Sequence, residues 1–124
     1  MLNQTNNEDE IAVRVIHCMH SKDREYIGRA NAKLGLAESP LHNPYPLFDE
    51  SQRASCVSKF RKYFSDKINA GDKVIMDEIY RLVDVAYTQG YINLGCWCKL
   101  KPPAPDRECH GDVIKEYLDR ILNP

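Results

Sequence analysis

The sequence predicts a small α/β domain: a sheet of about three or four strands, at least partly parallel, with about three helices. Residues 11–19 and 91–98 form short runs rich in β-branched, aromatic and other apolar residues, which is typical of strands. Three other segments carry apolar residues at the spacing of one helix face. The order strand, strand, helix, helix, strand, helix indicates that at least one pair of strands is parallel and joined through helices.

Composition limits the classes of function. The chain has 124 residues, 43% hydrophobic and 28% charged, with a formal charge of -1, so a single soluble domain is expected. It lacks the basic surplus that coats phosphate backbones, and bulk nucleic-acid binding is not expected. The start, MLNQTNNEDE, resembles neither a signal peptide nor a membrane anchor, and no later run is long and apolar enough to cross a membrane. We therefore expect a disordered arm at 1–10, a single domain at 11–124, a cytoplasmic location and no membrane partner.

The first half of the domain is predicted to hold two strands and a long loop. The run IAVRVIHCM (11–19) alternates well enough to be the first strand. After the polar turn HSKD, residues 24–29 (REYIGR) form a second, shorter strand. From Ala30 to Leu47 the pattern lapses into Gly, Asn, Ser and three prolines, which predicts an irregular loop of a length that is often functional.

Helices and one more strand follow. A capping box of Asp49 with Gln52 predicts a helix from about Glu50 to Ala70, with an apolar stripe of Ala54, Val57, Phe60, Phe64 and Ile68. Gly71-Asp72 ends it and caps a second helix, which carries Ile75, Ile79, Leu82, Val83 and Ala86 and stops at Gly90. YINLGCWC (91–98) is the last strand. The last helix has Asp112 in its first turn and an apolar face of Val113, Ile114, Tyr117, Leu118 and Ile121.

Chemistry-bearing residues follow the ends of the second and last strands. Ligands of parallel sheets collect beyond the carboxyl ends of the strands, near helix N-termini. We therefore expect a nucleotide-like or other phosphate-bearing small molecule at this edge. Arg29 would hold its phosphate, and Tyr26 or Trp97 would stack on it. The amides from Cys109 through Gly111 to Asp112 would complete an anion site.

The loop before the first helix adds one further candidate. Asn43, in LHNPYP, would either read a base edge or start a turn before Pro44.

The cysteines near the end of the last strand allow three interpretations. Five cysteines in an intracellular protein are expected to be thiols or metal ligands rather than disulfides. Cys96 and Cys98 could simply continue the apolar row of the last strand into the core. Together with Cys109 and His110 they could bind zinc, although a strand separates the Cα atoms of Cys96 and Cys98 by about 6.6 Å. Thirdly, Cys109 at a helix N-terminus could be a nucleophile with a lowered thiol pKa and His110 as its base.

Whether the protein is an enzyme stays open at this stage. If it is one, we expect hydrolysis or transfer at an N-glycosidic bond, with Asp112 or His110 as the acid or base and no cofactor. One alternative is a zinc-stabilised module that binds a protein or a nucleic acid. The other is a protein that sequesters a host nucleotide signal. The oligomeric state stays open, a homodimer included.

Four motifs carry a family resemblance. EYIGR (25–29), NPYP (43–46), LGCWC (94–98) and CHGDVI (109–114) resemble the family catalogued as domain of unknown function 4326, small proteins of phages and bacteria. The resemblance covers most of residues 11–122. It implies a prokaryotic or phage-infected host cell as the setting and a shared site at these motifs, and it implies no established reaction.

Overall fold

The fold is a small α/β domain in which a three-stranded sheet packs against three helices. The computed structural model describes residues 10–99 and 107–124. Its elements, in chain order, are the strands and helices β1 (Ala12–His17), β2 (Glu25–Tyr26), η2 (Ala32–Leu34), η3 (Glu50–Gln52), α1 (Arg53–Asn69), α2 (Lys73–Gln89), β3 (Tyr91–Cys96) and α3 (His110–Leu122), where η marks a single turn of 3-10 helix. The number of strands and helices agrees with the class that the sequence predicts.

All three strands of the sheet are parallel. The strand order is β1-β3-β2, so β3 enters between two strands that precede it in the chain. His17 pairs with Cys96, and Tyr26 pairs with Gly95. The three strands therefore end together, and the residues that follow them meet at one edge of the sheet.

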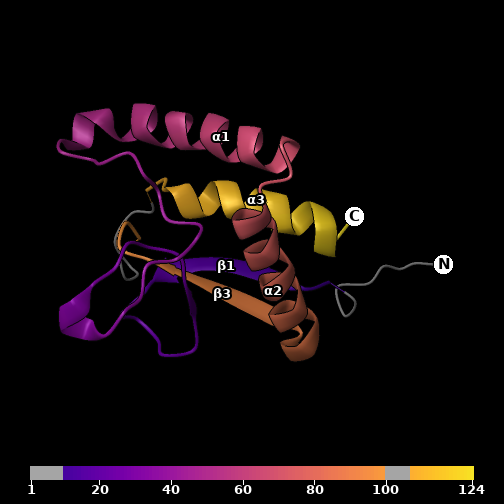
Figure 1. The fold of residues 1–124 in the computed structure, drawn as a ribbon. Coiled ribbons are helices and arrows are strands. Elements are labelled where there is room, and N and C mark those ends of the chain that lie inside the picture. The colour runs from indigo at the N-terminus through magenta and orange to yellow at the C-terminus, as the bar shows by residue number, and fades with distance from the viewer. Residues whose placement is uncertain (1–9, 100–106) are drawn as a thin grey trace.

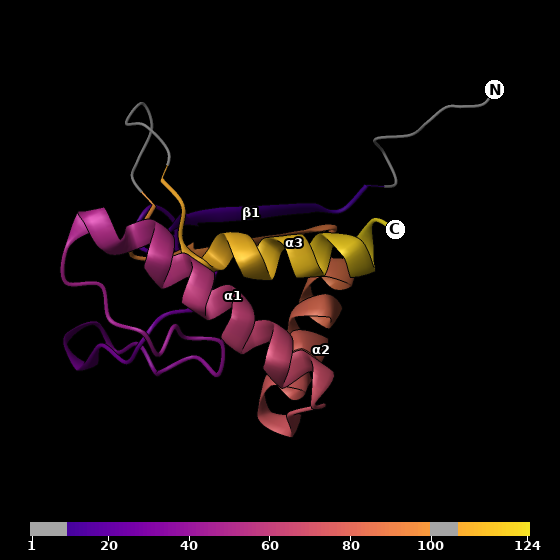
Figure 2. The ribbon, with the colours of Figure 1, turned by 90° about the horizontal axis from the view of Figure 1, so that it is seen from above.

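The three helices lie on the same side of the sheet, as the two ribbon views show (Figure 1 and Figure 2). α3 lies along the sheet next to β1, and α2 packs against β3. The strand residues that face the helices are buried, with Ile92, Leu94 and Cys96 of β3 completely so. Alternate burial along β3 arises because successive side chains of a strand point to opposite faces.

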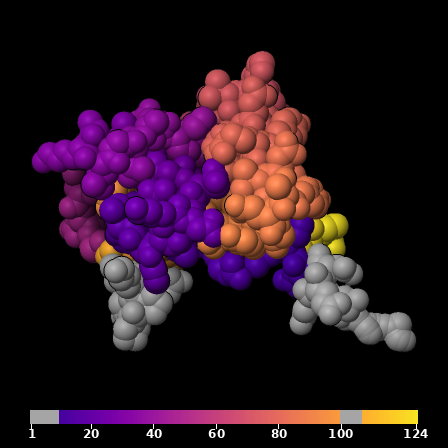
Figure 3. Space-filling view, turned by 90° about the horizontal axis from the view of Figure 1, so that it is seen from below, coloured from indigo at the N-terminus to yellow at the C-terminus, as the bar shows by residue number. Residues whose placement is uncertain are grey.

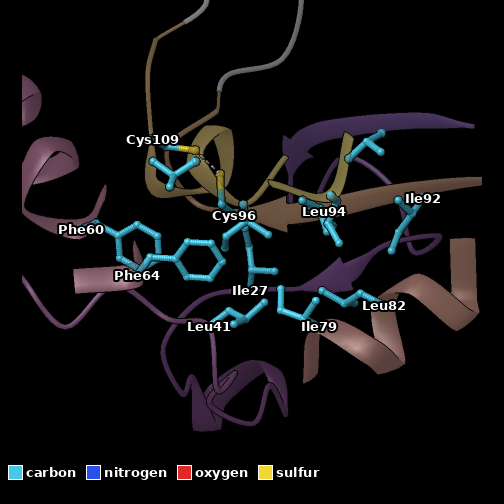
Figure 4. Close-up of a cluster of buried hydrophobic side chains, with 14 of the residues drawn as sticks. Ile27, Leu41, Phe60, Phe64, Ile79, Leu82, Ile92, Leu94, Cys96 and Cys109 are labelled. Carbon is cyan, nitrogen blue, oxygen red and sulfur yellow. Dashed lines mark hydrogen bonds between the residues drawn. The ribbon is translucent and has the colours of Figure 1, made fainter. Parts of the chain in front are cut away.

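The core lies where the apolar faces of the three helices pack against the buried face of the sheet. Phe60 and Phe64 of α1 stack on each other, with ring centroids 5.7 Å apart, next to the sulfurs of Cys96 and Cys109 (Figure 4). The other buried helix residues are Val57, Ile75, Ile79, Leu82, Ala86, Val113, Ile114, Leu118 and Leu122. Fully burying one such aliphatic side chain contributes about 1.5–3 kcal/mol, so this cluster is the main source of stability.

Helix starts and stops are largely as predicted from the sequence. The carboxylate of Asp72 accepts a hydrogen bond from the Ile75 amide at 3.1 Å and caps α2, which ends at Gly90 with φ of 87°. Glycine suits that left-handed conformation because it has no Cβ. Asp49 also acts as a cap, but of the η3 turn: its side chain accepts from the Ser51 amide at 3.1 Å, and α1 begins only at Arg53.

Some boundaries differ from the prediction. β1 ends at His17 and β2 covers only Glu25–Tyr26. β3 ends at Cys96, so Cys98 lies after the strand and not in its buried row. In α1 the predicted residues Val57, Phe60 and Phe64 are buried, but Ala54 is exposed, and Arg53 occupies the buried position one turn before Val57. The predicted arm lies outside the described residues, except for residue 10.

The opposite face of the sheet is more polar. The guanidinium of Arg14 lies 5.9 Å from the ring centroid of Tyr91, whose hydroxyl donates to the carboxylate of Asp23. Asn93 donates to the Asp23 carbonyl at 3.0 Å.

Seen from below, the indigo and purple N-terminal half packs against the salmon and orange part that contains α2 and β3 (Figure 3). No helix in the described part of the chain is long and apolar enough to span a membrane.

Candidate ligand pocket

A pocket with a volume of about 260 Å³ opens at the carboxyl edge of the sheet. The ends of β2 and β3, the loop before α1, the first turns of α1 and the start of α3 all contribute to it. Its lining residues are Gly28, Arg29, Asn43, Tyr45, Leu47, Arg53, Cys56, Val57, Trp97, Cys98, Cys109 and His110. Arg29 and Trp97 can meet here because β2 and β3 pair side by side and run in the same direction.

Arg29 anchors the loop before α1 to the end of β2. Its Nε and Nη2 atoms donate to the carbonyl oxygen of Asn43 at 3.0 and 2.8 Å. Arg29 is exposed, and no carboxylate among the described residues forms an ion pair with it. A guanidinium with this surplus charge can still bind an anion in the pocket.

Asn43 builds the turn that faces Arg29. Its Oδ1 atom accepts a hydrogen bond from the Tyr45 amide at 2.9 Å, which is an Asx turn, and its Nδ2 atom donates to the sulfur of Cys56 at 3.4 Å. Of the two predicted roles for Asn43, the structure shows the start of a turn. The amide group is therefore largely occupied within the protein.

Trp97 is held in place by Tyr26, the other residue that was predicted to stack on a ligand. Its Nε1 atom donates to the hydroxyl of Tyr26 at 2.7 Å, and that hydroxyl donates to the Arg29 carbonyl at 2.5 Å. The Trp97 ring also meets His17 edge to face, with centroids 5.4 Å apart. Trp97 lines the pocket and stays 38% exposed, whereas Tyr26 supports it from behind.

Gly28 allows this support to lie close to the backbone. A Cβ atom at residue 28 would lie 2.5 Å from the hydroxyl oxygen of Tyr26, closer than such atoms can approach. The glycine of the YIGR motif is thus required by packing between the pocket wall and the Tyr26 ring.

Arg53 is a second cation at the pocket and was not predicted from the sequence. It is only 9% exposed, and its guanidinium binds the Glu50 carboxylate at 2.8 and 2.7 Å and the Glu108 carbonyl at 3.1 Å. It also interacts with the Cys98 thiol, and the bond to Glu50 is the main cause that raises the pKa of Arg53. Unlike Arg29, Arg53 has its charge compensated.

His110 lines the pocket as the first residue of α3. Its Nε2 atom lies 2.8 Å from the carbonyl oxygen of Ile27 and donates to it, which leaves Nδ1 as the unprotonated nitrogen. Phe60 packs edge to face on the ring at 5.1 Å. Burial lowers the pKa of His110, so the ring is neutral at pH 7.

Asp112 and Gly111 lie at the helix start without lining the pocket. The Asp112 carboxylate accepts from the Cys109 amide at 3.0 Å and from Nζ of Lys99 at 3.1 Å, so it closes the helix cap. Gly111 packs on the sheet: a Cβ atom there would lie 2.7 Å from Val15 Cγ1. The predicted anion site at these amides therefore does not face the pocket, which has Arg29 and Arg53 as its positive groups.

Cys96, Cys98 and Cys109 lie together at the pocket, which Cys98 and Cys109 line. The sulfurs of Cys96 and Cys109 are 3.3 Å apart, and both side chains are fully buried. Cys98 forms hydrogen bonds with both and is partly exposed. Cys96 is part of the hydrophobic core, in agreement with the interpretation that it continues the apolar row of the last strand.

The cluster keeps the Cys109 thiol protonated instead of lowering its pKa. Hydrogen bonds to Cys96 and Cys98, together with burial, raise the pKa of the Cys109 thiol well above its usual range. The prediction of a lowered pKa at Cys109 was therefore wrong, because the influence of the neighbouring sulfurs and of burial exceeds that of the helix N-terminus.

The four side chains named for zinc are not gathered around one point. His110 directs Nε2 to the Ile27 carbonyl rather than to the sulfurs. Within residues 10–99 and 107–124, no group of three or more His, Cys, Asp or Glu side chains has an arrangement that could hold a metal ion. The zinc site of Cys96, Cys98, Cys109 and His110 stays a prediction.

The pocket unites several predicted residues with others that the sequence did not reveal. Arg29, Asn43, Trp97, Cys109 and His110 were predicted and line it. The missed lining residues with polar atoms are Tyr45, Arg53 and Cys56. Arg53 could have been suspected because, in a helix that begins at residue 53, it lies on the same face as Val57 and Phe60, where a cation needs a partner.

Comparison with known proteins yields one family. The sequence matches Domain of unknown function (DUF4326) over residues 13–120. No curated protein and no solved structure gives a significant match.

Proposed function

Because the chain belongs to the family of Domain of unknown function (DUF4326), a description that names no activity, we propose a function from the pocket itself. The protein binds a nucleotide-like, phosphate-bearing small molecule at the carboxyl edge of its parallel strands. The observation that carries this proposal is Arg29, an exposed guanidinium at the pocket with no carboxylate partner among the described residues.

Arg29 is pre-organised for an anion. Two of its donors are bound to the Asn43 carbonyl, which fixes the plane of the guanidinium against the loop. No hydrogen bond joins its Nη1 atom to the residues that the structure describes, so that atom is free for a phosphate oxygen. A charge-assisted bond of this kind is about twice as strong as a neutral one.

The rest of the pocket suits a base or a sugar next to the phosphate. Trp97 offers a partly exposed ring whose tilt is fixed by Tyr26 and His17, so stacking on it costs little side-chain entropy. Tyr45 and Leu47 also line the pocket and add apolar surface to it. A volume of about 260 Å³ is just below the roughly 300–1,000 Å³ of ligand sites, which suits one nucleotide or one half of a larger ligand.

Binding is proposed here in preference to cleavage. Asp112, the carboxylate predicted as acid or base, is engaged by the Cys109 amide and Lys99 and does not line the pocket. A protein that binds without cleaving would act by sequestering a nucleotide signal, one of the alternatives that the sequence left open.

The proposal is tested by a thermal-shift screen with nucleoside monophosphates, cyclic dinucleotides and ADP-ribose. A ligand at 100 times its Kd stabilises the folded state by about 2.7 kcal/mol, so at least one of these compounds should raise the Tm clearly. Arg29→Gln should abolish the shift, Arg29→Lys should retain part of it, and the surface variant Arg120→Gln should behave as the parent. Failure of every compound, or an undiminished shift in Arg29→Gln, would contradict the proposal.

A further inference from the structure

The three clustered cysteines differ in what they can do. Cys98 and Cys109 both line the pocket, but Cys109 is fully buried, as is Cys96, whereas Cys98 is partly exposed (Figure 4 shows the buried pair). A reagent that enters the pocket therefore meets the sulfur of Cys98 before the other two.

Donors surround the sulfur of Cys98. The thiols of Cys96 and Cys109 both form hydrogen bonds with it, and the guanidinium of Arg53 does so from α1. These interactions lower the pKa of Cys98 well below the usual range, with the bond from Cys109 as the largest cause. The pKa of Cys96 is raised to about 11, so Cys96 remains protonated as a donor.

Arg53 is itself held in place for this contact. The Glu50 carboxylate binds it through two atoms, and Arg107 also binds Glu50, at 3.0 Å. Arg107 in turn donates to the Cys98 carbonyl at 2.9 Å. The segment that carries Cys98 is thus fixed on both sides next to a buried cation.

The pocket contains another thiol, Cys56, with which Cys98 can be compared. Cys56 also lines it, but its thiol donates to the Tyr45 carbonyl at 3.2 Å and accepts only from the Asn43 amide. No guanidinium and no second thiol among the described residues forms a hydrogen bond with it. Cys56 is therefore a control thiol within the same cavity.

We propose that Cys98 is a nucleophilic thiolate open to the pocket and that Cys109 is its resolving thiol, so that a hydroperoxide converts the two into a disulfide. In the first step the Cys98 sulfur attacks one peroxide oxygen. An S–O bond forms, the O–O bond breaks, and the leaving hydroxide takes a proton from solvent. Cys98 becomes a sulfenic acid and the peroxide is reduced to water.

The second step uses the neighbouring thiol. The Cys109 sulfur attacks the Cys98 sulfur, an S–S bond forms, and the S–O bond breaks. The hydroxide that leaves carries away the Cys109 proton as a second water. Two sulfurs lose two electrons in total, and one hydrogen peroxide becomes two waters. Cys109 is close enough because its thiol already forms a hydrogen bond with Cys98.

The first test measures alkylation rates. The protein is treated with iodoacetamide at pH 6 and pH 8, and the modified tryptic peptides are quantified by mass spectrometry. Cys98 should react first, and its rate should change less than about threefold between the two pH values. An ordinary thiol with a pKa near 8.5 would gain roughly 70-fold over that interval. A rate for Cys98 that rises in parallel with that of Cys56 would overturn the proposal.

Variants separate the source of this reactivity. Cys98→Ser should remove the fast reaction. Arg53→Gln and Cys109→Ala, which each remove one donor, should both restore a rise with pH. Because Arg53 is buried, its variant could fail to fold, and the Cys109 variant then decides alone. If the alkylation rate of Cys98 stays independent of pH in Cys109→Ala, Cys109 is not the donor that lowers the pKa of Cys98.

The second test follows the oxidation. Trypsin places Cys96 and Cys98 in the peptide 82–99 and Cys109 in the peptide 108–115. One equivalent of hydrogen peroxide should join these peptides by a disulfide, both in the parent and in Cys96→Ala. The link should vanish in Cys98→Ser, and Cys109→Ser should yield a sulfenic acid that dimedone traps. No cross-link, or one that needs Cys96 instead of Cys98, would contradict the inference.

Discussion

The indole of Trp97 donates a hydrogen bond to the hydroxyl of Tyr26 at 2.7 Å and so joins the segment after β3 to the end of β2. The Tyr26 hydroxyl in turn donates a hydrogen bond to the Arg29 carbonyl. The Tyr26 hydroxyl thus positions the Trp97 ring and lies next to Arg29, the exposed cation of the pocket. The loss of that hydroxyl should disturb the site more than the fold.

Tyr26→Phe tests this arrangement. The variant leaves the Trp97 N–H without its partner, so we expect a loss of about 1 kcal/mol in the free energy of unfolding. The emission of Trp97, the chain's only tryptophan, should shift to longer wavelength as the ring becomes more mobile and more hydrated. Tyr80→Phe on the exposed side of α2 should change neither quantity, and an unchanged spectrum in Tyr26→Phe would show that the bond does not hold Trp97.

Gly111→Ala tests how closely α3 packs on the sheet. Helix propensity alone would make alanine more stable by about 0.5–1 kcal/mol. The added Cβ would lie 2.7 Å from Val15 Cγ1 and 3.0 Å from Ile27 Cδ1, so we expect a net loss of about 1–3 kcal/mol in chemical denaturation. Ser58→Ala, at an exposed position of α1, should be neutral or slightly stabilising. A more stable Gly111→Ala variant would mean that α3 can move off the sheet at little cost.

His110 should make stability depend on pH. Its folded-state pKa is lowered by burial, so as the pH falls below about 6.5 the unfolded chain binds a proton that the folded chain does not. The free energy of unfolding should therefore fall by up to about 1.4 kcal/mol per pH unit between pH 6.5 and the lower folded pKa. His110→Gln should flatten this slope, whereas His20→Gln, at an exposed position, should keep it. A slope that persists in His110→Gln would assign the proton to another group.

Metal content tests the zinc alternative. Among residues 10–99 and 107–124, no group of three or more His, Cys, Asp or Glu side chains is arranged to hold a metal ion. Protein purified without chelator should carry less than about half an equivalent of zinc by elemental analysis. Stoichiometric zinc that is lost, together with folding, in Cys98→Ser would instead support a zinc-stabilised module.

The sequence predicted the fold well because its signals are local. The apolar stripe of α2, its cap at Asp72 and its end at Gly90 are properties of a single segment, and all three are confirmed. The order of elements predicted at least one parallel pair of strands, and the structure shows that β1 and β2 both pair with β3 in parallel. Boundaries were less accurate: Cys98 was placed in a strand that ends two residues earlier.

The site was predicted only where residues follow strand ends. Arg29 and Trp97 were found because parallel strands bring such residues to one edge. The role of Arg53 depends on contacts with Glu108 and Cys98, far away in the chain, and no local pattern reveals these. The pKa of the Cys109 thiol was misassigned for the same reason, since its contacts with the sulfurs of Cys96 and Cys98, together with burial, decide it.

The most direct test of the proposed function is a titration of Trp97 fluorescence with nucleoside monophosphates, cyclic dinucleotides and ADP-ribose. The only tryptophan of the chain lines the pocket, so a bound base or phosphate changes its emission directly. We expect a saturable change with one of these ligands, with an affinity that is at least tenfold weaker in Arg29→Gln and unaltered in Arg120→Gln. Emission that stays constant with every ligand, or an equal affinity in Arg29→Gln, would contradict the account.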